Sequence, residues 1–157
     1  MKSFNLKPLR FIAIPLIVGA LAALLTQNSM SIFKTLEKPA LSPPGWLFPI
    51  VWTILYTLMG ISAYLIAQST AAPIDKAKAL TIYTYQLAVN FLWSIFFFNF
   101  EWYLFSFIWI ILLWALVFLM IRAFYKINRA VAYLNIPYLI WITFAAYLNF
   151  GIWWLNR

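Results

Sequence analysis

Charged residues are spaced so widely along this chain that their positions constrain its fold class. Five long uncharged stretches separate them, between Arg10 and Lys34, Lys38 and Asp75, Lys78 and Glu101, Glu101 and Arg122, and Arg129 and Arg157. A helix that crosses a bilayer needs about 20 mostly apolar residues, and each stretch is long enough to supply one. Hydrophobic residues make up 66% of the chain and charged residues 9%, against about 45–50% and about 25% in soluble domains. This composition excludes a soluble globule and predicts an all-α membrane protein.

The uncharged stretches predict one transmembrane domain over residues 1–157, built as a bundle of five helices. We expect spans at about residues 9–26, 46–67, 79–98, 103–121 and 131–155. The alternative reading of the first span, as the core of a secretory signal peptide, lacks a convincing cleavage site.

The longest predicted connection is the first loop, residues 27–45. Ser31 is placed to cap a short helix over residues 32–38, and Pro39 is expected to end it. Pro43 and Pro44 then stiffen the chain before the second span. A stiff loop over the mouth of a helical bundle indicates a lid over a pocket, and a plain connector is the alternative.

The distribution of Lys and Arg predicts the orientation, because basic residues concentrate on the cytoplasmic side of a membrane. Lys2, Lys7, Arg10, Lys76, Lys78, Arg122, Lys126 and Arg129 fall on the side of the N-terminus, and Lys34, Lys38 and Arg157 on the other. We therefore expect a multi-pass protein of the cell membrane with a cytoplasmic N-terminus. The net charge of +8 then indicates contact with lipid headgroups and no nucleic-acid partner.

Residues for ordinary catalysis are scarce. The chain has no Cys and no His, and Glu37, Asp75 and Glu101 are its only acids. We predict no metal site and no required cofactor, because acid–base or metal-assisted hydrolysis lacks the side chains it needs.

Aromatic and amide side chains share faces on three of the predicted helices. These faces carry Trp52 and Tyr56 on the second helix, Gln86, Asn90 and Trp93 on the third, and Tyr138, Trp141, Ala145 and Asn149 on the fifth. A single Asn in a span commonly bridges helices, but three such faces favour an aromatic cavity. It would suit a flat apolar ligand, such as a tetrapyrrole or a sterol-like lipid, with any acidic arms near Lys34 and Lys38.

Three motifs resemble those of the translocator protein family, also called the tryptophan-rich sensory protein or peripheral-type benzodiazepine receptor family. They are Lys38-Pro39 with Pro43-Pro44-Gly45-Trp46, Trp52, Tyr56 and Gly60; Gln86 to Asn90 with Trp93; and Ile136-Pro137-Tyr138 to Phe144 with Leu148-Asn149. The resemblance implies a five-helix bundle, a homodimer, and a pocket closed by the first loop. It also implies binding of porphyrins such as protoporphyrin IX, and of isoquinoline-carboxamide or benzodiazepine drugs.

The resemblance also implies pocket positions. These are Phe33, Pro43, Trp52, Tyr56, Asn90, Trp141 and Ala145, and the same motifs add Gln86, Trp93 and Leu148 to the candidate ligand-binding set. The chain departs from the family at Ile32 and Leu41, where Trp is common, and at Phe33, where Tyr is common. The residues do not indicate a specific preference for sterols, because the central Tyr of the cholesterol pattern is absent from the fifth helix.

Three functions are compatible with these residues. The first is binding of porphyrins and related hydrophobic ligands for sensing, transport or regulation of tetrapyrroles. The second is light- and oxygen-dependent porphyrin degradation, which the resemblance would assign to Trp52 and Trp141. The third is a structural or assembly role without a ligand, in which Gly19 and Ala23 of the first helix support helix association.

Overall fold

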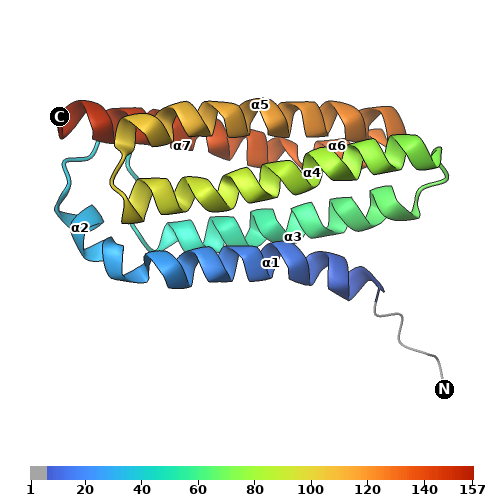
Figure 1. Cartoon of the computed structure of the whole chain (residues 1–157), viewed down its shortest axis with the longest axis horizontal. Helices are drawn as coiled ribbons and strands as arrows, with labels where there is room; N and C mark the ends of the chain where they lie inside the picture. The colour runs from blue at the N-terminus through green and yellow to red at the C-terminus, as the bar shows by residue number, and fades with distance from the viewer. Residues whose placement is uncertain (1–6) are drawn as a thin grey trace, which may run out of the picture.

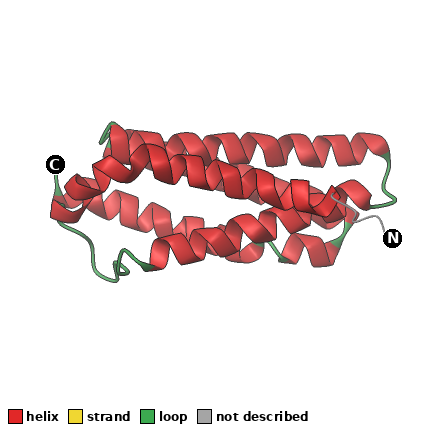
Figure 2. Cartoon of the chain, turned by 90° about the horizontal axis from the view of Figure 1, so that it is seen from below, coloured by secondary structure: helices red, strands yellow, loops and turns green. Residues whose placement is uncertain are grey.

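The computed structural model describes residues 7–157, so Lys2 of the predicted basic N-terminus lies outside the described part. Five long helices run antiparallel along one axis: α1 (Lys7–Thr26), α3 (Leu47–Gln68), α4 (Pro73–Ser94), α5 (Tyr103–Ile127) and α7 (Ile136–Leu155) (Figure 1). Figure 2 shows the same bundle from below, with helices throughout and only short connections. The predicted fold class is confirmed, because five helices are long and apolar enough to cross a membrane.

The short elements lie at the ends of the bundle. The helix α2 (Met30–Thr35) follows a single 3-10 turn, η1 (Gln27–Ser29), after α1, and lies at the same end as the C-terminus (Figure 1). A π-helical turn, η2 (Ile95–Asn99), closes α4, and α6 (Arg129–Tyr133) precedes α7.

Helix bounds differ from the expected spans where charged residues lie on a helix. The helix α4 begins at Pro73 rather than near residue 79, because Pro is favoured in a first turn and Asp75 there interacts well with the helix dipole. The helix α5 continues past residue 121 to Ile127 and carries Arg122 and Lys126 on its last turns. A span of apolar residues therefore marks the membrane-buried part of a helix and underestimates its length.

The predicted fifth span, residues 131–155, is two helices. Asn128 caps α6, since its side chain accepts hydrogen bonds from the backbone N–H groups of Ala130 (3.0 Å) and Val131 (3.3 Å). Pro137 lies in the first turn of α7, where its missing N–H costs no helical hydrogen bond.

The short helix of the first loop is present, but its predicted bounds and cap are wrong. It covers Met30–Thr35 rather than residues 32–38, so it ends before Pro39. Ser31 lies within it, and its hydroxyl donates to the Asn28 carbonyl (3.2 Å) instead of capping the helix.

The first helix packs against α3 at a glycine. A Cβ built on Gly60 would lie 2.5 Å from the Cα atom of Ile12 and 2.7 Å from the Phe11 carbonyl oxygen. The two helix backbones therefore touch, as small residues allow in membrane bundles. Such close approach holds α1 against the bundle near the N-terminal end, and the two helices flank the cavity nearer the other end.

Candidate functional site

A buried hydrogen-bonded network joins α3, α4 and α7 in the centre of the bundle. The Tyr138 hydroxyl donates to Gln86 Oε1 (2.8 Å) and accepts from Asn90 Nδ2 (2.6 Å), and the Tyr56 hydroxyl donates to Asn90 Oδ1 (3.1 Å). All four side chains are buried. Polar groups at this depth are tolerated because each finds a partner across the bundle.

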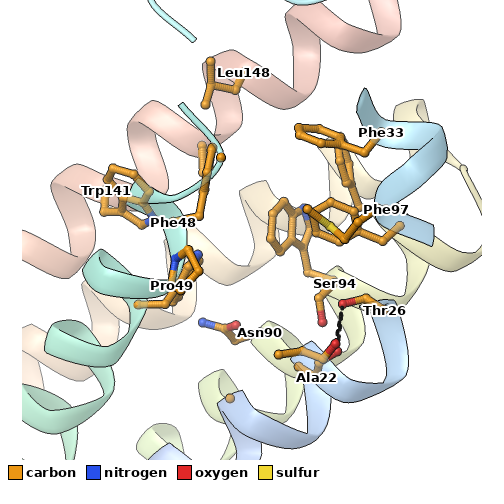
Figure 3. Close-up of a pocket in the computed structure, with 18 of the residues that line it drawn as sticks. Ala22, Thr26, Phe33, Phe48, Pro49, Asn90, Ser94, Phe97, Trp141 and Leu148 are labelled. Carbon is orange, nitrogen blue, oxygen red and sulfur yellow. Dashed lines mark hydrogen bonds between the residues drawn. The ribbon is translucent and has the colours of Figure 1, made fainter. Parts of the chain in front are cut away.

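A cavity of about 620 Å³ lies between this network and the first loop. Its volume is within the range of about 300–1,000 Å³ that is typical of small-molecule pockets. Figure 3 shows side chains from both sides around an open centre, with Trp141, Phe48 and Pro49 facing Phe33 and Phe97, and Asn90 at one end. The centre of the bundle is therefore hollow at this level rather than filled by its own side chains.

The structure brings the predicted site residues together, with one exception. Phe33, Pro43, Trp52, Tyr56, Asn90, Trp93, Trp141, Ala145 and Leu148 all line the cavity. Gln86 does not line it. Its side chain is fully buried behind Asn90, one helical turn deeper, and bonds to the Tyr138 hydroxyl and to the sulfur of Met59 (3.8 Å). Gln86 therefore supports the cavity floor and does not itself reach the open space.

Aromatic rings shape the cavity wall. Trp52 stacks on Tyr56, with ring centroids 5.4 Å apart and planes at 30°, and meets the edge of Tyr138 at 6.2 Å. On the same α3–α7 wall, Trp141 meets Phe48 edge to face at 5.8 Å, and Phe48 precedes Trp52 by one turn of α3. Tyr56 thus covers one face of the Trp52 indole. These flat apolar surfaces suit a planar ligand, which gains by stacking and by burial of apolar area.

Most polar groups in the lining are already hydrogen-bonded within the protein. The hydroxyls of Thr26 and Ser94 donate to helix carbonyls of Ala22 (2.9 Å) and Phe91 (2.7 Å). Trp93 Nε1 donates to Asn149 Oδ1 (3.1 Å). These groups have little donor capacity left for a ligand.

Trp141 is different. Its indole Nε1 is buried and has no hydrogen-bond partner among the residues that the structure describes. An unpaired buried donor costs about 1–3 kcal/mol, and this residue lines the cavity. The nitrogen is covered by surrounding protein atoms, so Trp141 borders the open space with other atoms of its side chain.

The interior tryptophans outside the cavity have partners instead. Trp109 Nε1 donates to the Val89 carbonyl (2.9 Å) and Trp114 Nε1 to the Thr143 hydroxyl (2.9 Å). They join neighbouring helices and do not belong to the site.

The first loop closes one end of the cavity and is attached to α7. The backbone N–H of Glu37 donates to Asn156 Oδ1 (3.0 Å), and Asn156 Nδ2 donates back to the Glu37 carbonyl (2.8 Å). The Tyr147 hydroxyl donates to the Ala40 carbonyl (2.8 Å). Phe33 and Pro43 of this loop line the cavity, as expected of a lid. The attachment at Asn156 gives the loop a fixed position over the cavity.

Sequence reasoning missed one whole wall, which α1 provides. Its lining residues are Leu16, Gly19, Ala20, Ala22, Ala23 and Thr26. A Cβ on Gly19 would lie 2.4 Å from the Tyr56 ring, so this glycine packs within its own chain. The small residues Gly19 and Ala23 are the sequence feature that marks this wall, although their spacing alone equally suits helix association.

Small exposed residues also mark where the cavity reaches the surface. Ala20 and Ala23 of α1 and Pro49 and Thr53 of α3 line the cavity and are exposed. The cavity wall therefore extends to the outside of the bundle between these two helices.

Comparison with known proteins gives one family. Residues 11–155 match the TspO/MBR family. The chain is 40% identical over 142 residues to the tryptophan-rich protein TspO of Archaeoglobus fulgidus, covering 90% of this chain and 91% of the relative. It is 37% identical to the protein of the same name in Chlorobaculum tepidum, over 79% of this chain and 78% of that one. It is 33% identical to the human translocator protein, over 77% and 72%.

Proposed function

This chain belongs to the TspO/MBR family of membrane proteins, and we propose that its cavity binds porphyrins and related planar hydrophobic ligands. Protoporphyrin IX is the ligand we expect, and the role would be sensing, transport or regulation of tetrapyrroles. The protein itself needs no further cofactor for such binding.

The observation that carries this proposal is a hollow walled by aromatic side chains. The cavity of about 620 Å³ is lined by Trp52, Trp93 and Trp141 and by Phe33, Phe48, Phe97 and Phe98. Keeping such a space open costs packing energy, and a bound ligand would recover it. A purely structural protein would gain from filling the space, so the hollow favours ligand binding over the assembly role.

The experiment is a titration of the purified protein in detergent with protoporphyrin IX, in darkness. Saturable binding with one site per chain, followed by the shift of the porphyrin absorption band, is the expected result. Absence of saturable binding would overturn the proposal.

A second candidate is light-dependent porphyrin degradation, which the placement of Trp52 and Trp141 in one cavity favours. Both indoles would lie close to an excited macrocycle and dissolved oxygen would be the oxidant. Illumination of the saturated complex should then give a discrete product. Degradation at an unchanged rate after Trp52→Phe and Trp141→Phe would exclude these residues from the reaction.

We also propose a placement in the cell membrane with the N-terminus in the cytoplasm. Lys7, Arg10, Lys76 and Lys78 lie at one end of the bundle together with the α5–α6 connection, and Lys34, Lys38 and Arg157 lie at the other (Figure 1). Reaction of single cysteines, introduced at each end, with a membrane-impermeant reagent in intact cells tests this orientation.

The family resemblance leads us to propose a homodimer as well. Native mass spectrometry of the detergent-solubilised protein would test it, with a mass of two chains as the expected result.

A further inference from the structure

Among residues 7–157, which the structure describes, Lys38 alone brings a charge to the cavity lining. All other lining side chains are apolar or neutral. The acids Glu37, Asp75 and Glu101 are not among them. Lys38 is exposed at the rim of this apolar space, so solvent and salt screen its charge and it acts on a ligand at short range.

The Lys38 ammonium is held in place by the loop. Its Nζ atom donates to the carbonyl oxygens of Lys34 and Leu36, both at 3.3 Å, and lies 5.0 Å from the centre of the Phe33 ring. These carbonyls stand at the C-terminal end of α2, where a cation is favoured by the helix dipole. Because Phe33 itself lines the cavity, the ammonium is positioned on a ring that borders the ligand space.

One donor of this ammonium remains for a ligand. Lysine has three N–H donors and no acceptor, and the two carbonyls engage two of them. A carboxylate is the acceptor that pairs best, since a charge-assisted hydrogen bond is roughly twice as strong as a neutral one. The fixed position lowers the entropic cost of forming that bond.

The neighbouring basic residue Lys34 offers a matched comparison. It lies on α2 and is exposed, as Lys38 is, but it does not line the cavity. Only its backbone carbonyl takes part, as an acceptor for Lys38. The sequence alone places both lysines near the mouth of the cavity, whereas in the structure Lys38 lines the cavity and Lys34 does not.

We propose that Lys38 recognises a carboxylate, so that the cavity prefers planar apolar ligands that carry an acidic arm. The aromatic body would lie against Trp52 and Trp141, and the carboxylate would reach the loop end beside Phe33. This inference rests on the proposed porphyrin binding and specifies which chemical form of the ligand is selected.

The test compares protoporphyrin IX, which has two carboxylates, with its dimethyl ester, which has the same macrocycle and none. Wild-type protein should bind the diacid about tenfold more tightly than the diester at low salt. Lys38→Met should lose this preference by weakening the diacid alone. Lys34→Met should retain it, and so should Lys38→Arg, which keeps the charge.

Equal affinity of the wild type for the two porphyrins would overturn the role of Lys38 while leaving porphyrin binding intact, and so would an unchanged preference in Lys38→Met. Failure of the wild type to bind either porphyrin would overturn both proposals. If Lys38→Met also lost the diester, Lys38→Gln would decide, because its amide can still donate to the loop carbonyls without a charge. Its preference should be lost, and a retained preference would refute the inference.

Discussion

Replacing the two cavity tryptophans, Trp52 and Trp141, should weaken porphyrin binding by an amount that their surroundings define. Tyr56 covers one face of the Trp52 indole by stacking at 5.4 Å, which leaves the other face for a ligand. Trp141 meets Phe48 only edge to face and keeps an unpartnered N–H.

The magnitude follows from the area of one indole face. A tryptophan buries about 150–250 Å² in full, and one face accounts for roughly a third of it, or about 50–80 Å². At about 25 cal/mol per Å² this corresponds to about 1–2 kcal/mol, which is about tenfold in Kd. Trp141→Ala should cost a similar amount, because its side chain also borders the cavity.

The double variant Trp52→Ala with Trp141→Ala should therefore raise the Kd for protoporphyrin IX about a hundredfold. Porphyrin absorbance is the suitable readout, because tryptophan fluorescence changes with the substitutions themselves. Trp114→Phe is the control, since Trp114 lies outside the cavity and bonds to Thr143. A double variant that stays folded and binds with unchanged Kd would refute the assignment of this cavity.

Three further predictions concern stability and the lid. Tyr138→Phe removes one hydrogen bond each from Gln86 and Asn90. The free energy of unfolding, measured by thermal unfolding in detergent, should fall by about 1–2 kcal/mol, and an unchanged midpoint would contradict the role of this network. Gly60→Val should destabilise the protein by about 2 kcal/mol or more, because its side chain meets the α1 backbone, whereas Gly45→Ala, with open space around it, should melt like the wild type. Asn156→Ala removes the attachment of the loop at Glu37 and should speed tryptic cleavage within the loop several-fold; equal cleavage rates would show that the attachment does not restrain it.

The helical bundle could be predicted because apolar length is a strong signal in a membrane protein. Every uncharged stretch corresponds to a long helix. The helix ends were predicted less well, because a helix can continue beyond its apolar residues. In α4, Pro73 and Asp75 favour a first turn that lies before the apolar stretch. Ser31 shows the converse, since a residue suited to capping lies inside a helix that begins one residue earlier.

The site was predictable where polar or aromatic residues repeat at helical spacing. Trp52 with Tyr56 and Asn90 with Trp93 follow that rule, and all four line the cavity. Gln86 lies on the same face of α4 as Asn90 and Trp93, but one helical turn further from the open space. Helical spacing predicts which face of a helix a residue occupies and does not predict whether the cavity extends to that residue. The α1 wall was missed because Gly and Ala can serve packing within a chain as well as between chains.

The structure of the protein determined with protoporphyrin IX tests the central claim most directly. We expect the macrocycle in the cavity against Trp52 and Trp141, with a carboxylate at Lys38. A porphyrin found outside the bundle, with the cavity closed by its own side chains, would contradict it.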